Sequence, residues 1–185
     1  MAVNNVCNEV PTISGTTNQI AVTQAAGTST ATIALASTVI NTSQPMFSAY
    51  LSTNPSNVTG DGTVYTVICD TKFFDQGTNY NTSTGTFTAP ATGKYIFSGS
   101  LLATNGGISA TGLFLLAVTG ISYTLDYSAI FTAALTRSFS GTVIVALTAG
   151  NTAQITFQAT GSTKTTSLIG GNGPVDTYFC GALLV

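Results

Sequence analysis

The sequence contains no histidine and no tryptophan, and only 5% of its 185 residues are charged. Because an average soluble domain is about 25% charged, this chain depends for its solubility on threonine, serine, asparagine and glutamine. The absence of histidine removes the usual general base of serine and cysteine nucleophiles. The six acidic residues are scattered, and no pair has an evident acid–base arrangement, although distant carboxylates could meet in the fold. We therefore expect no catalytic activity.

The scarcity of basic residues and of long apolar runs excludes two classes of partner. The four lysines and arginines leave a net charge of −2 and form no basic patch, so we expect no nucleic-acid partner. The longest apolar stretch, residues 112–121, is interrupted by Thr119 and Gly120 and is shorter than the roughly 18–20 residues that span a bilayer. We therefore expect no membrane insertion. Residues 1–10 show no signal peptide, which leaves open whether export uses another route or a signal was removed.

Three cysteines, Cys7, Cys69 and Cys180, show no spacing typical of a metal site. A zinc site that mixes cysteine and histidine is excluded because histidine is absent. We interpret Cys69 and Cys180 as buried free thiols, since unpaired cysteine is among the most buried residue types. Cys7 lies in a polar stretch and is a candidate for a link between chains. The sequence thus predicts no metal and no cofactor.

Residues 11–44 differ from the rest of the chain because their apolar residues form short alternating runs. The runs Ile20–Thr23 and Ala31–Leu35 are separated by turn residues, and strands this short cannot form a core alone. The pattern resembles segments of phage tail fibres and bacterial fibre proteins that form trimeric β-prism shafts. The resemblance implies a shaft over residues 11–44, after a disordered or linker segment over residues 1–10. Three copies around an axis would bury four apolar residues of each chain: Ile20, Val22, Ile33 and Leu35.

From Gln44 onward the sequence shows a succession of strand patterns and no helical period. Glycine, proline and asparagine clusters separate these patterns and mark turns. So many strands at this spacing indicate a sandwich or a barrel. The predicted strands are residues 46–52, 64–69, 85–89, 94–102, 112–118, 121–127, 138–147, 151–158 and 177–184.

The segment Cys69–Gly99 resembles the signature of the C1q domain, in which aromatic residues, an acidic or amide residue and a glycine recur at fixed spacing. The positions that match are Asp75, Tyr80, Phe87, Gly93, Tyr95 and Phe97. Cys69 and Gly99 depart from it, because the signature has aromatic residues there. Two flanking segments, Phe47–Ala49 and Thr177–Leu184, also resemble the beginning and the end of C1q domains.

This resemblance implies an all-β fold for residues 45–185: a C1q-like, ten-stranded antiparallel jelly-roll sandwich. The C1q and tumour necrosis factor family assembles as tight trimers with apolar contacts near the axis, so the resemblance also implies a homotrimer. A chain with few charges suits such an obligate interface, which buries about 2,000–5,000 Å². Strand alternation places Tyr95 and Phe97 on one face. The residues expected in the core or at the trimer interface are Tyr95, Phe97, Phe179 and Leu183.

Some members of this family bind calcium, and Asp61, Asp70 and Asp75 are candidate ligands if the chain does so. Calcium prefers several carboxylates, which are sparse here, so we expect no metal site.

If successive strands alternate in direction and the shaft enters at the base, four connections lie at the far end: residues 53–84, 103–111, 128–137 and 159–176. Loops on a rigid scaffold commonly carry binding sites. The predicted ligand-binding residues in these connections are Asn105, Ser109, Arg137, Lys164 and Asn172.

The sequence therefore predicts an extracellular or cell-surface, fibre-associated protein. Its function would be that of a trimeric fibre-tip adhesin that binds a cell-surface glycan or protein, with avidity from three-fold repetition. No tryptophan is available to stack on a sugar, but Tyr123 or Tyr127 could replace it. One alternative is a soluble signalling or recognition ligand of the C1q and tumour necrosis factor type. Another is a depolymerase tailspike, which would need catalytic carboxylates on a long β-helix.

Overall fold

The computed structural model describes residues 44–105, 109–132, 135–161 and 163–184. These residues belong to one unit, Ser43–Val185. Cys7, the predicted linker over residues 1–10 and, apart from Gln44, the predicted shaft lie outside the described residues. The roles of Ile20, Val22, Ile33 and Leu35 at a three-fold axis therefore stay predictions.

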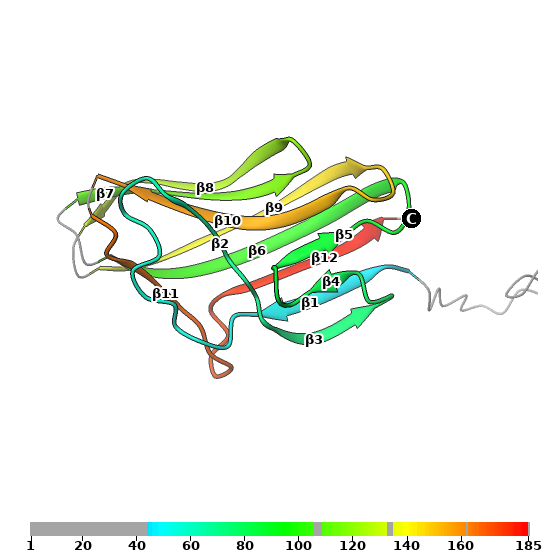
Figure 1. Ribbon diagram of the computed structural model, residues 1–185, viewed down its shortest axis with the longest axis horizontal. Coiled ribbons are helices and arrows are strands. Elements are labelled where there is room, and N and C mark those ends of the chain that lie inside the picture. The colour runs from blue at the N-terminus through cyan, green and yellow to red at the C-terminus, as the bar shows by residue number, and fades with distance from the viewer. Residues whose placement is uncertain (1–43, 106–108, 133–134, 162, 185) are drawn as a thin grey trace, which may run out of the picture. The chain divides into compact units, whose positions relative to one another are not determined.

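The chain folds into two six-stranded antiparallel sheets that pack face to face (Figure 1). The first sheet contains β1 (Met46–Tyr50), β3 (Thr71–Gln76), β6 (Gly93–Asn105), β9 (Thr136–Leu147), β11 (Thr166–Ile169) and β12 (Tyr178–Leu184). The second contains β2 (Val64–Thr66), β4 (Tyr80–Asn81), β5 (Thr86–Thr88), β7 (Ser109–Val118), β8 (Ile121–Thr132) and β10 (Thr152–Thr160). Among the described residues, no helix is long and apolar enough to cross a membrane. The predicted all-β jelly-roll sandwich is confirmed.

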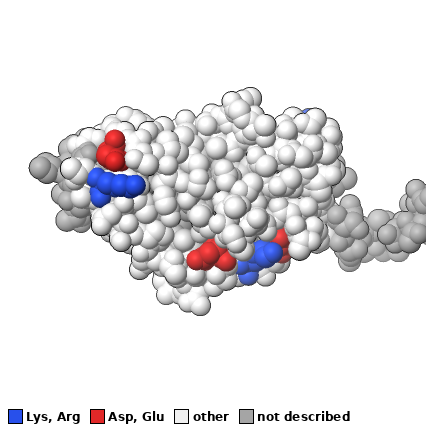
Figure 2. Space-filling view, in the orientation of Figure 1, with Lys and Arg blue, Asp and Glu red and all other residues white. Residues whose placement is uncertain are grey.

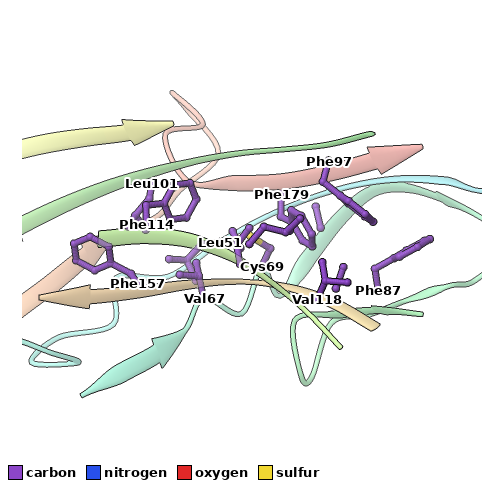
Figure 3. Close-up of a cluster of buried hydrophobic side chains, with 14 of the residues drawn as sticks. Leu51, Val67, Cys69, Phe87, Phe97, Leu101, Phe114, Val118, Phe157 and Phe179 are labelled. Atoms are coloured by element: carbon purple, nitrogen blue, oxygen red, sulfur yellow. The ribbon is translucent and has the colours of Figure 1, made fainter. Parts of the chain in front are cut away.

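The core between the sheets is built from residues that alternate along each strand. On β6, Tyr95, Phe97 and Leu101 are fully buried, and Ile96, Ser98 and Ser100 alternate with the inward positions and face outward. The side chains of Phe87, Phe97 and Phe179 come from different strands and converge between the sheets (Figure 3). The rings of Phe97 and Phe179 stack with their centroids 5.7 Å apart. Aromatic packing of this kind adds to the stabilisation that burial alone provides.

The structure settles the alternative between core and trimer interface for four residues of the signature and the C-terminal strand. Tyr95, Phe97 and Phe179 are 0–1% exposed in the single chain, so they belong to its core and leave no surface for a partner. Leu183 is half-buried and packs against that core. Of the two predicted alternatives, the core therefore applies to the first three, because the second sheet already covers them.

The described residues form twelve strands, whereas the resemblance implied ten and the sequence pattern predicted nine. The strands that the pattern missed are β3, β4 and β11. β3 has no clean alternation because its register against β1 shifts between Ser48 and Ala49, which leaves Phe73 without a partner, and Phe73 and Phe74 are both exposed. β4 and β11 are too short to show a period.

The chain ends of the head lie at one end of the sandwich, opposite the strand ends that flank the predicted binding residues. Met46 of β1 pairs with Ala182 of β12, so the first and last strands of the head bring its two chain ends to one end, which we call the proximal end. The ends of β6, β8 and β10 and the starts of β7, β9 and β11 lie at the opposite, distal end (Figure 1). At that end, Asn105 pairs with Thr166 in the first sheet, and Thr111 pairs with Thr160 in the second.

Candidate binding surfaces

Four of the five predicted ligand-binding residues lie at the distal end. Asn105 is the last residue of β6, Ser109 is the first of β7, and Arg137 is near the start of β9. Lys164 is exposed in the connection from β10 to β11. Their role in binding stays a prediction, but the fold does bring these four residues to one end.

Asn172 lies elsewhere, because β11 divides the segment 159–176. The connection from β11 to β12 leaves the first sheet at Ile169, opposite Leu102, and returns at Tyr178, opposite Ser100. The connection that contains Asn172 therefore lies beside the middle of β6, away from the distal end. The expectation that all of 159–176 is distal is wrong, since a four-residue strand intervenes.

Arg137 lies on the inner side of β9, at the distal opening between the sheets. Its guanidinium carbon is 5.7 Å from the centre of the Phe139 ring, which is itself fully buried. A cation held over an aromatic face is attracted to it, and this contact orients the guanidinium. Arg137 is exposed, and among the described residues the ion pairs seen do not include it. Its N–H groups are therefore available to an acceptor on a ligand.

Lys164 lies near Asp61 in two distal loops that pack tightly together. Hydrogen bonds from Thr63 lower the pKa of Asp61, and the charge of Lys164 has a smaller effect in the same direction. A β-carbon at Gly60, whose φ is +136°, would lie 2.0 Å from the backbone oxygen of Thr163. Only glycine permits this approach, so the two loops form a fixed platform.

The described part of the chain carries few charges, and their distribution is uneven. Arg137 and Lys164 accompany one acidic residue, Asp61, at the distal end. The remaining described charges are Lys72 and Lys94 together with Asp70, Asp75, Asp126 and Asp176. Figure 2 shows that most of the face in view is uncharged. The distal end is therefore the more basic part of the head.

The outer face of the first sheet carries one apolar row beside a row rich in hydroxyl groups, Ser48, Cys180, Ser98 and Thr142. The strand register places Met46, Ala182, Ile96 and Ile144 in one row across four strands. Ile144 is 56% exposed on β9, at one edge of the sheet.

At the opposite edge of this face, β3 exposes two aromatic residues. Phe73 is 57% exposed and Phe74 is 50% exposed. The ring of Tyr50 lies 4.7 Å from that of Phe73. We call this surface the first-sheet face; its residues are Met46, Tyr50, Phe73, Phe74, Ile96, Ile144, Tyr178, Cys180 and Ala182. Sequence reasoning missed it, although two adjacent aromatic residues on one strand cannot both point into a core.

The two described cysteines are free thiols in different surroundings. Cys69 is fully buried, and burial raises the pKa of its thiol to about 12. Cys180 is only half-buried, on the first-sheet face, where its thiol donates to the backbone oxygen of Ser98 at 3.6 Å. The prediction of a buried thiol thus holds for Cys69 but not fully for Cys180. Because the thiolate is the nucleophile, the raised pKa makes Cys69 unreactive at neutral pH.

The three carboxylates considered for calcium are not brought together. Asp70 accepts hydrogen bonds from the backbone and the hydroxyl of Ser52, at 2.9 and 3.0 Å. Asp75 forms an ion pair with Lys72 at 3.1 Å, and Asp61 binds the backbone of Thr63. Within the described ranges, no group of three histidine, cysteine or acidic residues is close enough to hold a metal.

An open depression of about 450 Å³ lies beside β4 and β5. Its lining is uncharged and is made of Thr78, Asn79, Tyr80, Asn81, Thr82, Thr88 and Pro90. No sequence signal pointed to it.

Comparison with known proteins agrees with this architecture. The sequence profile of the family described as "C1q domain" matches residues 46–184. The globular domain of zebrafish complement 1qA protein is 15% identical, with a TM-score of 0.52 over 76% of this chain and 98% of that chain. Murine APRIL at pH 8.5 is 13% identical, with a TM-score of 0.51 over 76% of this chain and 99% of that chain. At these identities the two structures show the fold alone. Comparison with curated proteins gives no match. The chain belongs to the C1q domain family.

Proposed function

We propose that this chain is the tip of a trimeric fibre, and that it binds a cell-surface glycan or protein through its distal end without catalysing a reaction. Domains of the C1q and tumour necrosis factor type are binding or signalling proteins without enzymatic activity, and they are typically extracellular. The observation that carries the proposal is the uncovered first-sheet face, together with distal loops at the end opposite the chain ends of the head.

The first-sheet face supports self-association. An exposed edge strand with adjacent aromatic residues is a liability in a monomer, and large apolar side chains exposed on one face favour an interaction there. Its most exposed residues lie at opposite edges: Phe73 and Phe74 on β3, and Ile144 on β9. Two different patches on one subunit favour a head-to-tail interface, which closes into a ring. Domains of this type form homotrimers, so a three-membered ring is the assembly we expect.

The distal end supports binding. In a trimer with its chain ends at the proximal end, the distal loops of three subunits would face away from the fibre. Arg137 and Lys164 would be presented three times, which turns a weak contact into useful avidity if the target carries spaced epitopes.

The binding role is tested with labelled intact protein on cells and on arrays of glycans and of cell-surface proteins. We expect Arg137→Ala and Lys164→Ala to lower avidity by about tenfold or more. Lys94→Ala is the charge-matched control, because Lys94 is an exposed cation at the proximal start of β6. Since Lys94 faces outward beside Ile96, this variant must first sediment like the unaltered protein. Binding that survives both distal changes, or that Lys94→Ala weakens equally, would overturn the distal site. Absence of binding on the glycan array, together with specific binding to a cell-surface protein, would exclude a glycan as the ligand.

A soluble recognition or signalling ligand is the second candidate, and the family match itself favours it. The sequence that precedes this chain in its gene separates the two. A repetitive β-shaft supports the fibre tip, whereas collagen-like repeats or a membrane anchor support the soluble or anchored ligand.

A further inference from the structure

We propose that Asn172 is a site of spontaneous deamidation, in which the backbone nitrogen of Gly173 attacks the side-chain amide. The inference rests on the connection between β11 and β12 and is independent of the fibre-tip proposal.

This connection is anchored on both sides of a short exposed tip. The backbone nitrogen of Gly170 donates to the Asn54 side-chain oxygen at 2.7 Å, and that of Gly171 donates to the Leu51 carbonyl at 2.8 Å. On the other side, Thr177 is buried. Between the anchors, residues 172–174 are all exposed. Within this connection, the tripeptide is the exposed part.

The Asn172–Gly173 pair is sterically open. A β-carbon at Gly173 would have no other heavy atom within 4 Å, and its φ lies outside the left-handed region. Within the part of the chain that the structure describes, no hydrogen bond of the Asn172 side chain is seen. Glycine has no β-carbon to hinder approach of its nitrogen to the preceding side chain, and its backbone turns freely. Asparagine is among the chemically labile residues, so this geometry favours cyclisation.

Other described candidates lack one of these conditions. The side-chain oxygens of Asn54, Asn81 and Asn151 each accept a backbone hydrogen bond, and none of these residues precedes a glycine. Asp61 precedes Gly62, but the nitrogen of Gly62 donates to the backbone of β10 at 2.9 Å, which holds it away from the carboxyl group.

The reaction has two steps. The Gly173 nitrogen loses its proton and bonds to Cγ of Asn172, and ammonia leaves, which closes a succinimide ring. Water then opens the ring at one of its two carbonyls and gives aspartate or isoaspartate, so that one water is consumed for each ammonia released. The chain gains one negative charge, and its formal net charge changes from −2 to −3. In isoaspartate the backbone also lengthens by one carbon between the two anchors.

The test is to incubate the whole protein at weakly alkaline pH and to follow the Asn172 peptide by mass spectrometry and by detection of isoaspartate. We expect a progressive increase in mass from amide to acid, with loss of that signal by at least several-fold in Gly173→Ala. Alanine fits at this open position, so the variant should fold normally. Asn172→Asp should migrate like the aged protein in native electrophoresis. Asn105 precedes Gly106, which lies outside the described residues, and its peptide is read separately.

Two results would overturn the proposal. One is an unchanged Asn172 peptide after incubation that deamidates a synthetic peptide of residues 168–178. The other is equal deamidation of Asn172 in the native protein and in Gly173→Ala.

Discussion

Replacing Thr177 by valine tests what stabilises the first sheet at the point on β6 where its partner changes from β11 to β12. The Thr177 hydroxyl donates to the carbonyl of Ile169 at 2.6 Å and accepts from the backbone nitrogen of Leu102 at 3.1 Å. The residue is 1% exposed, and its own carbonyl accepts from the nitrogen of Leu51. One side chain therefore joins β6 to the end of β11, while the backbone beside it holds the end of β1.

Valine has nearly the same shape but leaves the two backbone groups without their hydroxyl partner. A buried polar group that loses its hydrogen bond costs about 1–3 kcal/mol, so we expect the free energy of unfolding to fall by about 2–4 kcal/mol. For a domain of this size, each kcal/mol lowers Tm by roughly 3 °C, which gives a decrease of about 6–12 °C.

The assay is thermal unfolding at one fixed protein concentration, because association makes Tm depend on concentration. Thr124→Val makes the same chemical change at an exposed position on β8, and it should change stability by less than about 0.5 kcal/mol. A Thr177→Val protein as stable as Thr124→Val would refute the assignment of Thr177 as the junction between the strands.

Two further predictions concern the core. Gly112→Ala should destabilise the fold by about 1–3 kcal/mol in denaturant titrations, because its β-carbon would lie 2.5 Å from the Phe139 ring; unchanged stability would mean that the ring moves freely. Burial raises the pKa of Cys69 from 9.0 to about 12. Between these pH values the thiol loses its proton in the unfolded state but keeps it in the folded state. The free energy of unfolding therefore decreases as the pH rises through this range. Cys69→Ala should have a shallower decrease across this range in unfolding titrations, and an identical slope would contradict the burial of the thiol.

The sequence predicted the sandwich because its central strands obey simple alternation. Tyr95 and Phe97 on β6 are separated by one outward residue, and this alternation can be recognised from the local sequence alone. Spacing alone could not tell core from interface, since a residue that faces a second sheet and one that faces a second chain show the same pattern. The burial of Tyr95, Phe97 and Phe179 within the single chain decides between core and interface.

The parts that sequence reasoning missed depend on contacts between distant segments. β11 is recognisable only because it pairs with the end of β6. That pairing moves Asn172 away from Lys164, although both lie in one stretch between predicted strands. No strand was predicted over Phe73 and Phe74, which lie between two of the predicted strands. Their exposure follows from the place of β3 at the edge of its sheet, which local sequence does not encode.

The central claim is that the first-sheet face joins three copies of the chain, and sedimentation equilibrium tests it most directly. The account predicts a species of about three times 18.8 kDa, which Phe73→Ser combined with Phe74→Ser converts to folded monomer. Tyr127→Ser is the matched control, because Tyr127 is an aromatic residue 55% exposed on the second sheet, and it should leave the trimer intact. A stable monomer of the unaltered chain, or a trimer that survives the double change on β3, would contradict the account.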